Sequence, residues 1–261
     1  MLASLTQDLF LGGKVKVWQP VNGYRAGADP VFLAAATPAF SGQSVLELGC
    51  GAGTASLCLG RRVADLTLTG IEVQEEYADL ARRNATENEL KLSVHTADLC
   101  ALPDAVKQQS YDHVIANPPY YLSDRGKMAR EAGKNRALWE DTPLSEWLMA
   151  AAKRLAPKGV LSVIQDAPRL PDLFAAMPSQ LGSIEVLPLA AREGRRARRV
   201  LLRARKSGNA EFCLHSGVSL HDGASHTSDR DDYSDRIRGV LRDGAPLEFP
   251  AIHSKDGRKS V

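Results

Sequence analysis

Cysteine is scarce in this chain of 261 residues, which has only Cys50, Cys58, Cys100 and Cys213. No two of them form a Cys-x-x-Cys pair, so the sequence predicts neither a zinc knuckle nor a dithiol redox motif. The six histidines show no metal-ligand spacing either, and we expect no metal site. Isolated cysteines are most simply reduced core residues of a cytoplasmic protein, and the cytoplasm is the compartment we expect.

Long hydrophobic runs are also missing. The longest uncharged stretch, residues 31–46, is interrupted by Pro38 and Gly42, so we expect no membrane span. The first eleven residues include Asp8 and no basic residue, which is unlike a secretory signal. Hydrophobic residues nevertheless make up 44% of the chain and charged residues 25%, a composition typical of a globular protein rather than a disordered one.

Net charge is small, at +2, but basic residues are concentrated in one segment. Residues 192–206 carry eight Arg or Lys and one Glu, a net charge of +7 over 15 residues. Such a local field attracts phosphate groups, although ordinary surface charge is the alternative. The sequence therefore predicts a surface for RNA. Its predicted members are Arg192, Arg195, Arg196, Arg198 and Arg199.

From residue 44 onward the chain alternates short apolar strands with helices. We expect strands at 44–47, 66–71, 92–96, 111–116, 160–164, 184–189 and 200–204, and helices at 54–63, 75–88 and 144–155. This order predicts an α/β fold of the Rossmann-like type, with seven strands in a mostly parallel sheet and helices on both faces. The last two strands have no helix between them and predict an antiparallel hairpin at one edge.

Three regions follow from the same pattern. Residues 1–40 are expected to hold a hairpin and one helix, with Asp29 as the helix N-cap and Pro30 at the first helical position. Residues 41–208 form the main α/β domain, and residues 209–261 form a C-terminal extension with a short helix at 236–241 and a partly flexible tail. The polar segment 121–142 is expected either to close over a substrate or to be a solvated loop.

The first strand of the sheet runs into a turn that contains Gly49, Gly51 and Gly53. Their spacing is Gly-x-Gly-x-Gly, which differs from the Gly-x-Gly-x-x-Gly of dinucleotide sites. Glu47, two residues before the first glycine, would repel a pyrophosphate but is able to face a cation. S-adenosylmethionine carries a sulfonium and an ammonium group, so an acidic pocket suits this methyl donor.

Acidic residues end the next two strands. Glu72 is placed to accept hydrogen bonds from ribose hydroxyls, and Asp98 with its neighbour Leu99 is placed to reach an adenine amine. A plain turn and solvated loop caps are the alternatives for the individual residues. Three such features at consecutive strand ends predict a methyl-donor site.

The fourth strand ends in Asn117-Pro118-Pro119-Tyr120. The amine of adenine is a poor nucleophile because its lone pair is delocalised into the ring. The side-chain oxygen of Asn117 and the carbonyl of Pro118 are two acceptors that draw this lone pair out, and the prolines hold the backbone rigid. Tyr120 offers a flat surface on which the base stacks. A rigid turn is the alternative interpretation of this motif, but its place beyond a methyl-donor loop favours catalysis.

Together the glycine turn and the Asn-Pro-Pro-Tyr motif resemble class I amino-methyltransferases of nucleic acid bases and of protein glutamine. Three flanking segments (10–14, 23–30 and 199–206) resemble the bacterial valine-tRNA adenine-N6 methyltransferases, and the resemblance spans roughly residues 10–247. It implies a class I methyltransferase fold, and transfer of a methyl group from S-adenosylmethionine to N6 of the adenosine beside the anticodon, at tRNA position 37.

The resemblance also assigns roles to residues. Residues 117–120 would hold the target base, and Gly27 with Asp29 matches a motif beside the methionine end of the donor. The complete set expected to bind the donor is Gly27, Asp29, Glu47, Gly49, Gly51, Gly53, Glu72, Asp98, Leu99 and Asn117. The expected partner is RNA, most simply tRNA. The alternatives are a glutamine-N5 methyltransferase acting on protein, a ribosomal RNA or DNA adenine methyltransferase, and a non-catalytic RNA factor that binds the donor.

Overall fold

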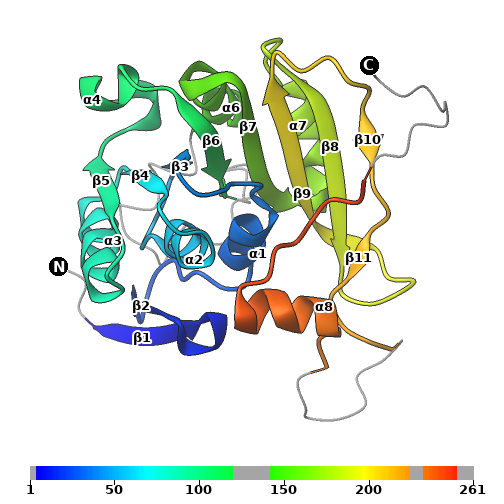
Figure 1. The fold of residues 1–261 in the computed structure, drawn as a ribbon, viewed down its shortest axis with the longest axis horizontal. Helices are drawn as coiled ribbons and strands as arrows, with labels where there is room; N and C mark the ends of the chain where they lie inside the picture. Colours follow the sequence, from blue (N-terminus) through cyan, green and yellow to red (C-terminus); the bar gives the residue numbers. More distant parts are fainter. Residues whose placement is uncertain (1–3, 120–141, 224–231, 252–261) are drawn as a thin grey trace, which may run out of the picture.

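The structure is a computed structural model that describes residues 4–119, 142–223 and 232–251 (Figure 1). Three features predicted from the sequence lie outside these residues. They are Tyr120, nearly all of the polar segment 121–142 and the tail from residue 254.

Seven strands form the body of one sheet, as predicted. They are β3 (Ser44–Leu48), β4 (Thr67–Glu72), β5 (Leu92–Thr96), β6 (Tyr111–Ala116), β7 (Leu155–Asp166), β8 (Leu181–Ala190) and β9 (Ala197–Lys206). Their order across the sheet is β8-β9-β7-β6-β3-β4-β5, and the strands from β7 to β5 are parallel. Strand β9 pairs antiparallel with both β7 and β8, which confirms the hairpin.

The hairpin is not at the edge of the sheet, however. Two strands of two residues each, β10 (Cys213–Leu214) and β11 (Val218–Ser219), pair with the outer side of β8 and bring the described sheet to nine strands. Without them β8 would present a long row of unpaired backbone groups to water. The C-terminal extension therefore protects the edge that the sequence pattern leaves open.

Helices cover both faces of the sheet (Figure 1). On one face α1 (Asp29–Ala36), α2 (Thr54–Arg62) and α3 (Glu75–Glu87) share a hydrophobic core with residues such as Val45. On the other face α4 (Asp104–Lys107), α6 (Leu144–Arg154) and α7 (Leu170–Ala175) surround a second core that includes Leu46 and Leu48. Neighbouring residues of β3 point to opposite cores, as the pleat of a buried strand requires. Trp147 is fully buried in the second core.

Helix α1 begins one residue earlier than predicted. Ala28 occupies the N-cap position and no side chain caps the helix, while Pro30 lies in its first turn. The prediction of Asp29 as the cap was wrong because its carboxylate accepts a hydrogen bond from Arg199 Nε at 2.8 Å instead. Asp29 thus forms an ion pair with Arg199 of β9 and does not cap the backbone of α1.

The N-terminal hairpin and the segment of the C-terminal extension that begins with α8 (Asp235–Arg238) lie side by side below the sheet in the view of Figure 1. Strands β1 (Leu5–Phe10) and β2 (Val15–Pro20) form a hairpin through the 3-10 turn η1 (Leu11–Gly13). The extension contributes α8 and the π-helical turn η4 (Gly239–Asp243), which packs against η1. The backbone N–H of Leu247 then donates to Ala35 O at 2.9 Å. Residues from both ends thus share one core with α1 and α2.

The cysteines only partly follow the prediction. All four are free thiols, and Cys50 and Cys58 are buried, but Cys100 is exposed and Cys213 is half-buried. The expectation of four core residues was therefore wrong for two of them. In the part of the chain that the structure describes, no helix is long and apolar enough to cross a bilayer, and no three His, Cys, Asp or Glu side chains are grouped to hold a metal ion.

Candidate functional site

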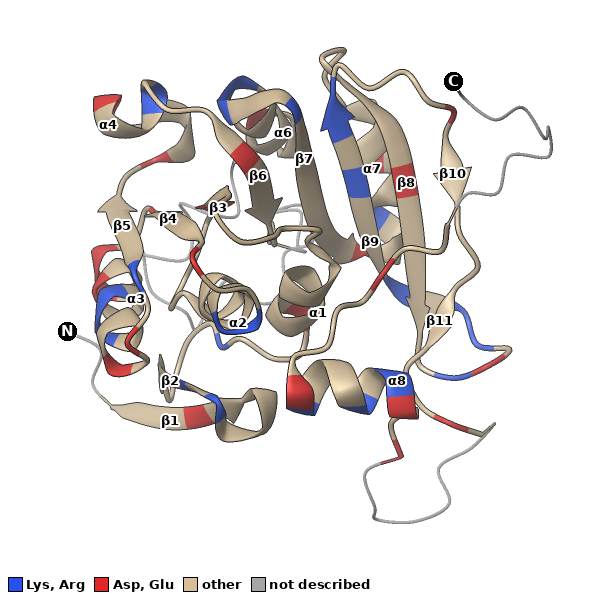
Figure 2. Ribbon diagram, viewed as in Figure 1, with Lys and Arg blue, Asp and Glu red and all other residues tan. Residues whose placement is uncertain are grey.

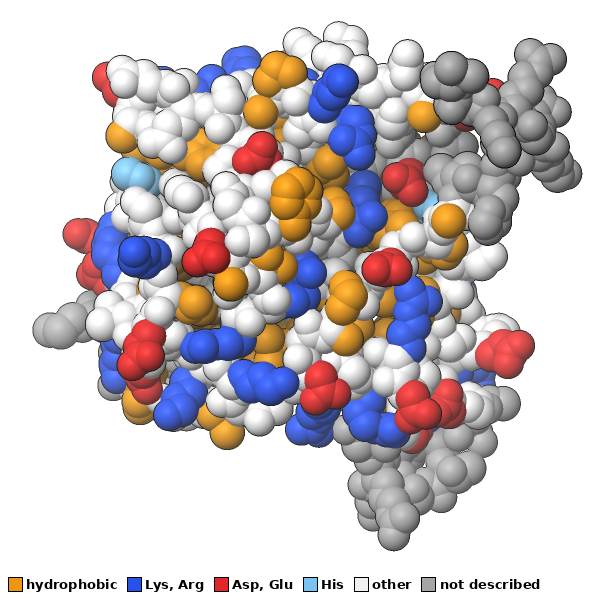
Figure 3. Space-filling model, in the orientation of Figure 1, with side chains coloured by type: hydrophobic (Ala, Val, Ile, Leu, Met, Phe, Trp, Pro, Cys, Tyr) orange, Lys and Arg blue, Asp and Glu red, His pale blue; other side chains and the backbone are white. Residues whose placement is uncertain are grey.

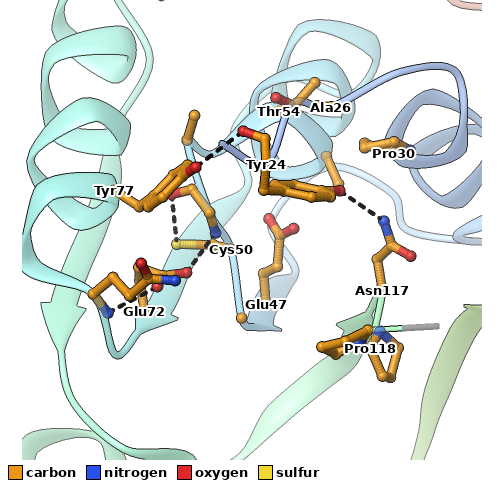
Figure 4. Close-up of a pocket in the computed structure, with 16 residues that line it drawn as sticks. Tyr24, Ala26, Pro30, Glu47, Cys50, Thr54, Glu72, Tyr77, Asn117 and Pro118 are labelled. Atoms are coloured by element: carbon orange, nitrogen blue, oxygen red, sulfur yellow. Dashed lines mark hydrogen bonds between the residues drawn. The ribbon is translucent and has the colours of Figure 1, made fainter. Parts of the chain in front are cut away.

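The main pocket opens at the carboxyl ends of β3, β4 and β6, where the chain order across the sheet reverses between β3 and β6. This is the position at which open α/β sheets bind ligands. The pocket encloses about 1120 Å³ of space not filled by atoms, counting its open mouth. Its lining residues are Tyr24, Ala26, Pro30, Glu47, Gly49, Cys50, Gly51, Ala52, Thr54, Ala55, Glu72, Gln74, Tyr77, Asn117, Pro118 and Pro119 (Figure 4).

The glycine turn forms the floor of this pocket. Gly49 and Gly51 have φ values of 66° and 53°, in the left-handed region that favours glycine, and both line the pocket. Gly53 also has a positive φ, of 85°, but a Cβ there would lie 3.3 Å from Ala81 Cβ and from Leu92 Cδ2. The structure therefore gives Gly53 a packing role against α3 and β5 instead of a place in the pocket.

Glu72 accepts hydrogen bonds from the backbone of two segments, the glycine turn and the loop that follows β4. Its Oε2 accepts a hydrogen bond from Gly51 N at 2.8 Å, and its Oε1 accepts one from Gln74 N at 2.9 Å. Two backbone donors keep the buried carboxylate in place at the end of β4. Each carboxylate oxygen accepts more than one hydrogen bond, so this arrangement is compatible with ribose hydroxyls as further donors.

Glu47 is fixed at the end of β3 by the start of α2. Its Oε2 accepts hydrogen bonds from both the backbone N–H, at 3.0 Å, and the hydroxyl of Ser56. Burial raises the pKa of Glu47 to about 8, although the two Ser56 hydrogen bonds act in the opposite direction. A positive charge placed in the pocket would favour the ionised carboxylate.

Asn117 and the two prolines form the wall opposite the glycine turn (Figure 4). Asn117 Nδ2 donates to Tyr24 Oη at 3.4 Å, and a Cβ at Gly51 would lie 3.8 Å from Tyr24 Cε1, so the ring also contacts the glycine turn. The carbonyl of Tyr24 accepts a hydrogen bond from Tyr77 Oη at 3.1 Å, which fastens this segment to α3. Burial, reinforced by the nearby carboxylates of Asp29 and Glu47, raises the pKa of Tyr24, so its phenol is neutral.

Tyr24 and Tyr77 are pocket residues that the sequence reasoning did not single out. Tyr24 belongs to the flanking segment 23–30 that carried the resemblance, so its position was a usable signal. Tyr77 lies on the buried face of α3, and nothing in the helix pattern marks its hydroxyl. Gly27 and Asp29 do not line the main pocket, whereas their neighbours Ala26 and Pro30 do.

Asp98 and Leu99 line a second, smaller pocket that also includes Gly49 of the glycine turn. The Asp98 carboxylate accepts a hydrogen bond from Cys100 N at 2.8 Å and so caps the 3-10 turn η2 (Leu99–Ala101). The two pockets share Gly49, so residues predicted to hold different parts of one donor lie along one edge of the sheet. Their roles toward the donor stay predictions.

The five predicted RNA-binding arginines fall into two groups. Arg199 pairs with Asp29 and Asp166, and Arg192 pairs with Asp232. Arg192 and Arg199 therefore link segments that are distant in the sequence. The side chains of Arg195, Arg196 and Arg198 are exposed and form no ion pair within the described residues.

Arg195 and Arg196 lie in the turn between β8 and β9, which carries Lys or Arg in Figure 2, and Arg198 is the second residue of β9. Strand β9 runs antiparallel to β7 and pairs Arg199 with Asp166, the last residue of β7. The turn therefore lies on the side of the sheet where the parallel strands have their carboxyl ends, which is also the side of the pocket. Over the face formed by α1, α2 and α8, by contrast, acidic and basic side chains are interspersed (Figure 3).

Comparison with known proteins identifies the fold and the family. The sequence model of the methyltransferase small domain family matches residues 30–188 of this chain. A tRNA1(Val) (adenine(37)-N6)-methyltransferase of Porphyromonas gingivalis is 29% identical over 196 residues, which cover 69% of this chain and 76% of the relative. A protein of the same name from Cronobacter sakazakii is 31% identical over 134 residues, covering 50% of this chain and 54% of the relative.

Solved structures share the architecture. A predicted O-methyltransferase, Atu636 of Agrobacterium tumefaciens, superimposes with a TM-score of 0.69 at 23% identity, covering 85% of this chain and all of that one. The Thermus thermophilus 16S rRNA N2 G1207 methyltransferase, solved in complex with AdoMet and guanosine, has a TM-score of 0.54 at 18% identity and covers 78% of this chain and 50% of its own. The fold is that of the class I methyltransferases, as the sequence predicted.

Proposed function

Because this chain belongs to the methyltransferase small domain family, we propose that it methylates N6 of an adenine in tRNA, namely adenosine 37 of a valine tRNA. Methyl transfer from S-adenosylmethionine is the chemistry of the class I fold. The proposal adds the acceptor atom, the class of RNA and the residues that act. We extend the proposal to the cytoplasm, the compartment in which such a substrate is methylated.

The main pocket fits the donor by two observations. Gly49 and Gly51 present bare backbone to it in a conformation that side chains disfavour, and two buried acidic side chains, Glu47 and Glu72, line the same pocket. We assign Gly49 and Gly51 to contact with the donor, Glu72 to its ribose, and Asp98 with Leu99 to its adenine. When bound, the donor supplies an electrophilic methyl group on a sulfonium.

The observation that carries the proposal is the wall formed by Asn117, Pro118 and Pro119 in the same pocket. Its side-chain and backbone oxygens are acceptors for the two N–H groups of an adenine amine, and they draw its lone pair toward the methyl group. The amine loses its proton after transfer, so no strong general base is required. The neutral phenol of Tyr24 accepts from Asn117 Nδ2, which favours the amide orientation that keeps Oδ1 for the substrate.

Two observations favour a tRNA over a protein glutamine as the acceptor. Arg195, Arg196 and Arg198 are exposed at the same edge of the sheet as the pocket, where they are placed to contact phosphates. The curated relatives that match this chain are named for adenosine 37 of tRNA1(Val).

Mass spectrometry of nucleosides from total tRNA tests the proposal. The gene is deleted and then restored as wild type, as Asn117→Ala, or as the control Asn209→Ala, which changes an exposed asparagine far from the pocket. We expect N6-methyladenosine to disappear on deletion and to return with wild type and Asn209→Ala only. Mapping of the modified fragment then identifies the adenosine. Unchanged N6-methyladenosine after deletion would refute the tRNA assignment.

A further inference from the structure

The last two residues of β7 are linked to two parts of the pocket lining, one directly and one through an ion pair, without lining the pocket themselves. Gln165 is completely buried, with an exposed fraction of 0%. Its Nε2 donates to the carbonyl of Pro118 at 3.2 Å, and its Oε1 accepts from the backbone N–H of Asp166 at 2.8 Å. The side-chain amide thus spans the gap between the end of β7 and the proline wall.

This contact is needed because the ladder between β6 and β7 stops just before it. The last registered pair is Ala116 with Val163. Pro118 and Pro119 have no backbone N–H, so regular pairing cannot continue along β7. A carbonyl at the edge of a buried sheet still needs a donor, and Gln165 supplies it from a side chain.

The same end of β7 is also linked, through Arg199, to the start of α1. Asp166 pairs with Arg199, and Arg199 Nε donates to Asp29 Oδ2 at 2.8 Å. Asp29 begins α1 and is followed by Pro30, which lines the pocket. One dipeptide, residues 165–166, is therefore tied to the proline wall on one side and to the start of α1 on the other.

We propose that Gln165 is a positioning residue for methyl transfer, which sets the direction of the Pro118 carbonyl. That carbonyl is one of the two acceptors for the target amine, so the inference rests on the proposed function. Gln165 does not line the pocket that holds the donor. Its loss is therefore expected to slow transfer while leaving the affinity for the donor unchanged.

A Gln165→Glu variant gives a test with a pH signature. A protonated Glu has one O–H to donate to Pro118 and one oxygen to accept from Asp166, which reproduces the native pattern, whereas a carboxylate has no donor. Burial raises the pKa of such a carboxyl. We expect kcat near the wild-type value at pH 6 and roughly tenfold below it at pH 9, with the Kd for S-adenosylmethionine unchanged at both.

The wild-type profile is the reference for this experiment. The charged groups beside Gln165 are Asp166, Arg199 and Asp29, and Glu47 in the pocket has a pKa of about 8. Wild type and variant share these groups, so the ratio of the two profiles reports the effect of the introduced carboxyl. A control for buried acid in general is Asn88→Asp, where an amide that is also buried bonds Lys16 O and N outside the pocket.

Two further results complete the test. Gln165→Leu cannot bond Pro118 at any pH, so its kcat is expected to be about tenfold low throughout. Crystal structures of Gln165→Glu at pH 6 and pH 9 are expected to show the Pro118 carbonyl displaced at the higher pH only. This displacement tests the positioning role even if tRNA proves not to be the substrate. A folded Gln165→Leu with wild-type kcat, or a Gln165→Glu profile parallel to wild type, would overturn the inference.

Discussion

At the scale of single residues, Glu47 links the pocket to the stability of the protein. Burial raises its pKa to about 8 in the folded state, whereas an unperturbed carboxyl has a pKa near 4.5. Between these values the folded protein holds a proton that the unfolded chain has lost. The folded state binds more protons, so the free energy of unfolding falls as pH rises through this window, by a few kcal/mol at most.

Glu47→Gln is therefore expected to flatten this dependence. Urea unfolding at pH 5, 7 and 9 measures it, with the exposed Glu211→Gln as a control that keeps the wild-type slope. Parallel curves for wild type and Glu47→Gln would show that Glu47 is ionised in the folded protein at all three pH values.

Tyr24 offers a second test at this scale. Tyr24→Phe removes the hydroxyl that accepts from Asn117 Nδ2 and leaves the ring in place. Because the contact is long, at 3.4 Å, we expect kcat to fall only about threefold, with no change in the Kd for the donor. Steady-state kinetics and calorimetry measure the two quantities.

Tyr111→Phe is the matched control for Tyr24. Tyr111 is buried at the far end of β6, and its hydroxyl has no hydrogen-bond partner within the described residues. This variant is expected to keep wild-type kcat. Equal kcat in Tyr24→Phe and wild type would remove Tyr24 from the orientation of Asn117.

At the scale of the elements, the apolar pattern predicted the body of the sheet well. Strands β5 and β6 agree with the prediction to the residue. Strands β7, β8 and β9 are longer than predicted, since backbone pairing continues beyond the apolar stretch and into residues such as Arg205. Hydrophobicity marks burial, whereas the ends of strands depend on neighbours that are distant in sequence.

The residues of the candidate site could also be predicted only in part. The glycine turn, Glu72 and Asn117 were predictable because each follows directly from the end of a strand. The pairing of Arg199 with Asp29 was not predictable, because the partners are separated by 170 residues. From its positive charge alone, Arg199 was interpreted as a residue that contacts phosphate. Gln165 was missed because its role depends on how close the Pro118 carbonyl lies to the end of β7, which the sequence alone does not show.

The division among the arginines predicts two different phenotypes. Changing Arg195, Arg196 and Arg198 together to Ala should weaken tRNA binding roughly tenfold and lower the salt dependence of log Kd by about two, without changing Tm. Arg199→Ala should instead lower Tm and weaken donor binding, because it releases Asp29 and Asp166.

Filter binding at several salt concentrations and thermal unfolding measure these effects. A control of equal charge changes Lys91, Lys107 and Lys153, which are exposed at the opposite edge of the sheet. Equal loss of tRNA affinity in this control and in the arginine variant would show that net charge alone is responsible.

At the scale of the whole molecule, the two ends of the described chain share one core. Leu247 has an exposed fraction of 0% and belongs to the same cluster as Leu11 and Val31. We expect Leu247→Ala to lower the free energy of unfolding by about 2–4 kcal/mol, in a single transition that also ends donor binding. The exposed Leu214→Ala should change it little. Urea unfolding followed by fluorescence and by donor binding checks this, and an early step that spares donor binding would contradict it.

The bond between Leu247 and Ala35 also bears on how the protein is made. Helix α1 is completed early in synthesis, but the segment that covers it leaves the ribosome only after the whole sheet has been translated. The apolar face that η1 and α1 present to Val240 and Leu247 stays open in every shorter nascent chain. Closure of this core thus follows translation of every strand of the sheet, and the interval before it is when the chain most needs protection from aggregation.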